Sequence, residues 1–127
     1  MRRRLIITSC MLLLALMLAV PTFAAESSAI SASNKSPYKH NFSKRWGETI
    51  KKTTSSGSVN RLQYGYNTRA INEDYAYANS NGYRHRSKIV NARGTYYGPK
   101  KWANEGWSDK EVRHKGSTVK YYCNVFK

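Results

Sequence analysis

The sequence predicts an all-β protein, a small antiparallel β-sandwich, on three grounds. Apolar and polar residues alternate with a period of two in several runs, as they do in half-buried strands. The chain contains 10 tyrosines among 127 residues, with threonine and valine around them, and these residue types favour strands. Glycine and asparagine interrupt the alternating runs at short intervals, as they do in turns. We expect two small sheets that pack face to face.

The first 24 residues have the composition of a signal peptide. Arginines at positions 2–4 precede an apolar run that ends at Val20, and Pro21 follows. Thr22 and Ala24 then provide small residues at the two positions that a signal peptidase recognises. An uncleaved anchor helix is the alternative, but the apolar run is shorter than the ~20 residues that span a bilayer. We expect cleavage after Ala24 and a secreted, extracellular protein.

The mature chain is strongly basic and lacks an internal disulfide. The full chain has 22 Lys and Arg against 7 Asp and Glu. Three arginines leave with residues 1–24 and no acid does, so 19 basic residues remain and the net charge becomes +12. Cys10 leaves too, so Cys123 has no partner within the mature chain. We expect Cys123 to be buried in a core of aromatic residues; an intermolecular disulfide and a reactive thiol are the alternatives.

Residues 25–43 are expected to form a flexible spacer or a pro-segment. This stretch is rich in Ser, Ala and Asn and has few large apolar side chains. It buries too little surface to offset the chain entropy that folding would cost. The folded domain, a basic β-sandwich, is therefore expected over residues 44–127.

The first expected strands of this domain are residues 46–53, which alternate weakly, and residues 58–66. In the second, Leu62, Tyr64 and Tyr66 share one face. Two further strands follow at residues 75–80 and 83–92. Asn81-Gly82 lies between them and predicts a tight hairpin, because this dipeptide readily adopts positive φ angles.

The end of the chain contains a weak helix signal and the clearest strand. Residues 108–111, Ser-Asp-Lys-Glu, have the form of a capping box, although the run to Gly116 allows little more than two helical turns. Residues 117–126 alternate strictly. The alternation places four residues on one face of this strand: Val119, Tyr121, Cys123 and Val125.

The sequence gives little support for catalysis, and we expect that the protein is not an enzyme and binds no metal or cofactor. The three histidines are widely separated, and no pair has a metal-binding spacing. A nucleophilic pair of Cys123 with a histidine conflicts with the strand pattern, which buries Cys123. A carboxylate pair of Glu48 with Glu73 or Asp74 has no local support.

Cations and aromatic residues are interleaved in the second half of the chain. In residues 83–88, alternation puts Arg84, Arg86 and Lys88 on one face of a strand. A turn at residues 98–102 adds two lysines and a tryptophan. The residues expected to bind a partner are Tyr83, Arg84, His85, Arg86, Lys88, Lys100, Lys101, Trp102 and Trp107.

A solvated surface that keeps the protein soluble explains part of this charge, but not an excess of twelve. The electrostatic field of such an excess of positive charge concentrates anionic partners near the protein. Outside a cell these are membrane surfaces, teichoic acids and pyrophosphate-bearing wall precursors. Nucleic acid fits the same electrostatics but is not expected for an exported protein.

Residues 77–88 resemble the Ser-Asn-Tyr-x-His-x-Ser-Lys region of the lactococcin 972 family of secreted bacteriocins. Gly106-Trp107 and residues 120–127 resemble the later Gly-Trp and the terminal Tyr-Tyr-Asn strand of that family. Residues 62–65 stand where the family has a Trp-x-Tyr-Gly motif. The chain departs from the family pattern in Leu62, which replaces the expected Trp, and in Cys123, which is inserted into the Tyr-Tyr-Asn ending.

This resemblance implies a small antiparallel β-sandwich, often self-associating, that inhibits related bacteria by engaging their envelope, with a lipid-linked wall precursor as target. We therefore expect a bacteriocin-type protein whose cations bind phosphate oxygens and whose Tyr and Trp side chains lie at the membrane interface. A non-toxic envelope-adhesion or structural module is one alternative. A small wall-active enzyme, or an inhibitor of a secreted enzyme, is the other.

Overall fold

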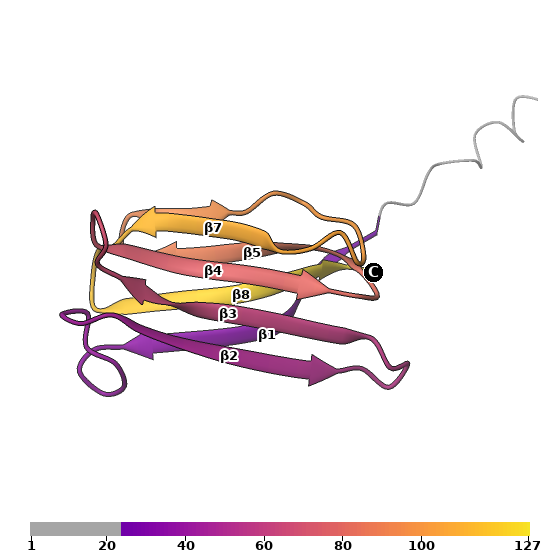
Figure 1. Cartoon of the computed structure of the whole chain (residues 1–127), viewed down its shortest axis with the longest axis horizontal. Coiled ribbons are helices and arrows are strands. Elements are labelled where there is room, and N and C mark those ends of the chain that lie inside the picture. Colours follow the sequence, from indigo (N-terminus) through magenta and orange to yellow (C-terminus); the bar gives the residue numbers. More distant parts are fainter. Residues whose placement is uncertain (1–23) are drawn as a thin grey trace, which may run out of the picture.

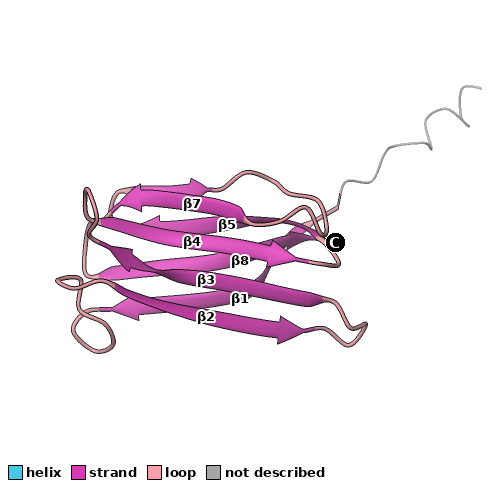
Figure 2. Ribbon diagram, viewed as in Figure 1, coloured by secondary structure: helices cyan, strands magenta, loops and turns pink. Residues whose placement is uncertain are grey.

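Two antiparallel sheets of four strands make up the computed structural model, which describes residues 24–127 and confirms the predicted fold class. The first sheet has the order β1 (Glu26–Lys35), β8 (Thr118–Phe126), β5 (Arg84–Asn91), β6 (Gly94–Tyr97). The second has the order β2 (Trp46–Thr53), β3 (Val59–Asn67), β4 (Glu73–Ser80), β7 (Ser108–Arg113) and faces the viewer in Figure 1. Strands and loops account for all of residues 24–127 (Figure 2). The predicted signal peptide lies outside the described residues, apart from Ala24.

The core lies between the two sheets and is built as the alternation predicts. On β8, Val119, Tyr121, Cys123 and Val125 are fully buried. Across the interface, β3 contributes Leu62, Tyr64 and Tyr66, which are also buried and confirm the predicted face of that strand. The rings of Tyr64 and Tyr121 lie 4.9 Å apart, and Trp46 meets both edge-on. Aromatic packing of this kind supplies the core of a small domain that has no disulfide among its described residues.

The first strand corrects the prediction that residues 25–43 stay outside the fold. Residues 26–35 form β1, which pairs with β8 from Glu26 opposite Phe126 to Lys35 opposite Thr118. Ile30 fills the inner face. The prediction considered only the apolar surface that this segment could bury. It omitted the backbone hydrogen bonds that an edge strand gains from a neighbouring strand, which small Ser and Ala side chains do not hinder.

The Asn81-Gly82 turn corrects the predicted hairpin. It joins β4 to β5, but β4 pairs with β3 and β7 while β5 pairs with β8 and β6. Asn81 is tied to the first residue of β3 by hydrogen bonds of 2.7 and 3.2 Å, and the Ser80 hydroxyl accepts from the N–H groups of Gly82 and Tyr83. These bonds turn the chain from one sheet into the other. The turn therefore connects the two layers of the sandwich.

Residues 108–111 belong to a strand, β7, and the helix signal there is wrong. The Ser108 hydroxyl donates to the Pro99 carbonyl at 2.5 Å and accepts from the Ser87 N–H at 3.0 Å. It therefore ties the preceding loop to β5 instead of capping a helix. The pairing of β7 with β4 supplies the backbone hydrogen bonds that a helix of two turns would have supplied.

The thiol of Cys123 should be unreactive in the folded protein. Its burial raises the pKa of the thiol to about 12, and its sulfur contacts the Asn79 carbonyl oxygen at 3.8 Å. We expect a thiol reagent to label Cys123 only when denaturant is added, and Cys123→Ala to cost on the order of 1 kcal/mol of stability while the fold is kept. Time courses of labelling with and without guanidinium test this. Fast labelling in native buffer, or a predominant disulfide-linked dimer on a non-reducing gel, would contradict it.

Candidate functional site

The outer face of the first sheet brings together cations and aromatic rings from four parts of the chain. On β5, Arg84, Arg86 and Lys88 project outward, as predicted, while His85 and Ser87 are buried beneath them. Strand pairing places Phe126 opposite Arg84, and Tyr122 opposite Lys88. On the other side of β5, Tyr97 of β6 also lies opposite Lys88. The register therefore sets rings on both sides of a row of cations.

Four cations of this surface each lie over an aromatic ring. The distances from cation to ring centroid are 4.5 Å for Arg84 and Trp102, 3.9 Å for Arg86 and Tyr97, 4.8 Å for Lys88 and Tyr122, and 5.0 Å for Lys100 and Phe126. Contacts of this type are each worth about 0.5–1 kcal/mol at exposed sites. We call these eight residues the cation–aromatic face. Its cations are held in position before any ligand arrives, which lowers the entropy lost on binding.

One acid neutralises part of this face. Glu26 of β1 accepts two hydrogen bonds of 2.7 Å from Arg86, one from Nε and one from an Nη. This bidentate pair lowers the pKa of the Glu26 carboxyl and raises that of the Arg86 guanidinium. The pair therefore links β1 to β5 across the intervening β8, and Arg84, Lys88 and Lys100 remain as the cations of the face that are available to an anion.

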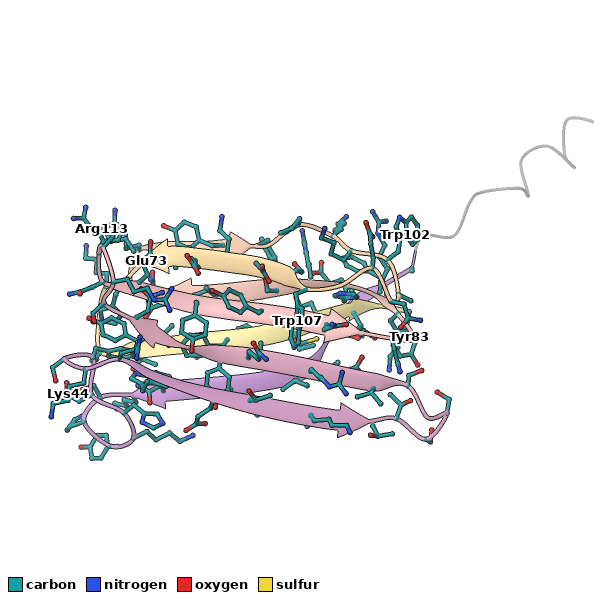
Figure 3. All side chains as sticks on the ribbon, in the orientation of Figure 1. Lys44, Glu73, Tyr83, Trp102, Trp107 and Arg113 are labelled. Atoms are coloured by element: carbon teal, nitrogen blue, oxygen red, sulfur yellow. The ribbon has the colours of Figure 1, made fainter. Side chains whose placement is uncertain are left out.

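An open groove of about 520 Å³ lies at one end of the face, lined by Tyr83, Arg84, Lys100, Trp102 and Phe126 among others. The Trp102 side chain is 64% exposed at its rim. Figure 3 shows Tyr83 and Trp102 at this same end of the sandwich. The groove combines two cations with aromatic walls, so it suits a ligand that carries both an anionic group and an apolar part.

Three of the predicted residues lie elsewhere. His85 is fully buried, with Nδ1 2.9 Å from the Tyr83 carbonyl oxygen and Nε2 2.8 Å from that of Gly106, so it supports the fold and we remove it from the binding set. Lys101 pairs with His85 through two backbone hydrogen bonds, so its side chain projects toward the inner side of the sheet. Trp107 precedes the buried Ser108 and lies on the outer face of the second sheet (Figure 3).

Four residues of the site were not expected from the sequence: Glu26, Tyr97, Tyr122 and Phe126. Alternation along β8 does place Tyr122 and Phe126 on the face opposite Cys123, and this was the available signal. Alternation along β8 could not, however, identify β5 as the strand that pairs with β8.

Two of the carboxylates considered for catalysis, Asp74 and Glu48, have other partners. Asp74 is buried and accepts hydrogen bonds from Asn91 at 2.9 Å and His114 at 2.8 Å, and its burial raises its pKa. Glu48 contacts His40 and Tyr64, each at 2.5 Å. Among residues 24–127, no three His, Cys, Asp or Glu side chains gather into a set that could hold a metal ion. The same residues contain no helix long and apolar enough to cross a membrane.

The chain matches no protein-family model, no curated protein and no solved structure.

Glu26 should weaken the attraction of this face for anions. Glu26→Gln removes one negative charge and releases Arg86, and a cation near an anionic membrane surface is worth about 1 kcal/mol, or about fivefold in affinity. We expect the variant to bind phosphatidylglycerol vesicles about fivefold more tightly in a sedimentation assay. Asp109→Asn, an exposed position on the second sheet, removes the same charge and is the control. Equal tightening by both variants would show that only net charge matters.

Proposed function

We propose that this protein is a secreted, non-enzymatic antibacterial protein of the bacteriocin type, related to the lactococcin 972 family, that binds an anionic component of the envelope of related bacteria. The observation that carries the proposal is the cation–aromatic face, where four cations lie over rings on one outer surface of the sandwich. The resemblance of residues 77–88 to that family supports the biological role.

Arg84, Lys88 and Lys100 would donate charge-assisted hydrogen bonds to phosphate oxygens. Trp102 and Phe126 line the groove beside two of these cations and would lie at the boundary between head groups and acyl chains, where amphipathic rings are favoured. A lipid-linked wall precursor offers both a pyrophosphate and a lipid, and it is the specific ligand that we propose. A membrane surface or a teichoic acid offers the anionic part alone.

The acids of the chain support this assignment by their positions. Glu48 accepts a hydrogen bond from Tyr64, and Asp74 accepts one from Asn91. Glu111 accepts a hydrogen bond from Tyr77, and Glu105 accepts one from the Trp102 N–H at 2.6 Å. Glu26 is the acid that pairs with a cation of the cation–aromatic face. The remaining basic residues there are thus left to act on an external anion.

Charge reversal on the face tests the proposal. Arg84→Glu with Lys88→Glu removes two cations worth about 1 kcal/mol each near an anionic surface, so affinity for phosphatidylglycerol vesicles should fall at least about 30-fold. Inhibition of related strains in a growth assay should fall with it.

The matched control is Lys51→Glu with Lys52→Glu, which changes the net charge equally at exposed positions of β2 in the other sheet. Circular dichroism would verify that both variants are folded. Equal losses from the two variants would contradict a specific face. Vesicle binding without any growth inhibition by the unaltered protein would favour the adhesion module.

A further inference from the structure

A second concave surface lies on the opposite side of the sandwich, on the outer face of the second sheet. This groove has a volume of about 560 Å³, which is within the usual range for ligand pockets. Its walls include Arg45, Arg69, Glu73, Tyr75, Tyr77 and Glu111. Figure 3 shows Glu73 at the left end of this sheet. None of these residues belongs to the cation–aromatic face.

The floor of this groove is formed by the rings of Tyr75 and Tyr77, and two glycines make room for the first of them. Gly47 of β2 and Gly65 of β3 lie directly opposite each other, and Tyr75 of β4 lies opposite Gly65 on the next strand. A Cβ atom at either glycine would overlap the Tyr75 hydroxyl. The Tyr75 side chain therefore lies across β3 in the space that two side chains would otherwise fill. Its position on the sheet is fixed by these neighbours.

Tyr77 extends this floor toward β7. Its ring centroid is 5.1 Å from that of Tyr75, with an angle of 32° between the ring planes. The Tyr77 hydroxyl donates a hydrogen bond to Glu111, and burial is the largest cause of the raised pKa of both tyrosines. The two rings are thus held side by side, one by the glycine gap and the other by a carboxylate.

The charges around the floor balance. Arg45 and Arg69 contribute two positive charges and Glu73 and Glu111 contribute two negative charges, in a chain whose formal net charge is +15. Gln63 and Asn67 add amide donors and acceptors. The groove therefore lacks the field that would select an anion, and it presents donors and acceptors around an aromatic surface.

We propose that this groove binds an uncharged saccharide. The C–H face of a sugar ring is apolar and packs on aromatic rings, while its hydroxyl groups both donate to carboxylates and accept from guanidinium groups. The Tyr75–Tyr77 floor and the charge-balanced rim supply these two kinds of contact together. The sandwich would then carry a glycan site and an anion site on opposite faces.

The test uses the full secreted protein and two uncharged probes, chitotetraose and maltotetraose, which differ in linkage and substitution. We expect at least one of them to shift the backbone amide NMR signals of Gly47, Gly65 and Tyr75. Tyr77→Thr should weaken that binding about tenfold or more. Arg69→Ala, at an exposed position, should weaken it with no effect on folding. Tyr38→Thr, which removes a highly exposed tyrosine outside the groove, is the matched control and should bind normally.

The absence of shifts with both probes, or shifts confined to residues outside the groove, would overturn the proposal. Equal affinity of the Tyr77→Thr, Arg69→Ala and Tyr38→Thr proteins would also overturn it. The probes carry no charge, so this result is independent of whether the cation–aromatic face binds an anionic envelope component.

Discussion

Strand β8 lies between β1 and β5, and its alternation determines both the core and the candidate binding face. Its inward residues, Tyr121 and Cys123 among them, are fully buried against the second sheet. The rings of its outward residues Tyr122 and Phe126 lie under the ammonium groups of Lys88 and Lys100, respectively. A shift of β8 by one residue would exchange the two sets, burying polar groups and exposing the core. Stability of the core and geometry of the face therefore depend on one register.

The features that could be predicted from the sequence are those fixed by local periodicity. Alternation along β8 predicts the burial of Cys123, and alternation along β5 predicts that Arg84 and Lys88 share a face. Strand neighbours are not local, so the contacts of Arg86 with Tyr97 and of Lys88 with Tyr122 could not be predicted from the sequence. The position of His85 in a charged run groups it with the basic residues, whereas the fold buries it between two carbonyl oxygens.

The two candidate binding surfaces of this protein differ in charge. On the first sheet Glu26 is paired with Arg86, which leaves Arg84, Lys88 and Lys100 facing outward over aromatic rings. On the second sheet the groove over Gly47 and Gly65 is charge-balanced and floored by two tyrosines. A sandwich keeps these surfaces apart, because the core lies between them. This arrangement would allow one small domain to contact two chemically different parts of an envelope.

The central claim is that aromatic rings, and not charge alone, make the outer face of the first sheet a binding site. The most direct measurement is the affinity for phosphatidylglycerol vesicles of Tyr97→Thr combined with Tyr122→Thr, which leaves every charge in place. Threonine favours strands, so the fold should be kept. Because both rings lie against Lys88 and hold it in position, we predict weaker binding at unchanged net charge. A folded variant that binds as tightly as the unaltered protein would contradict the account.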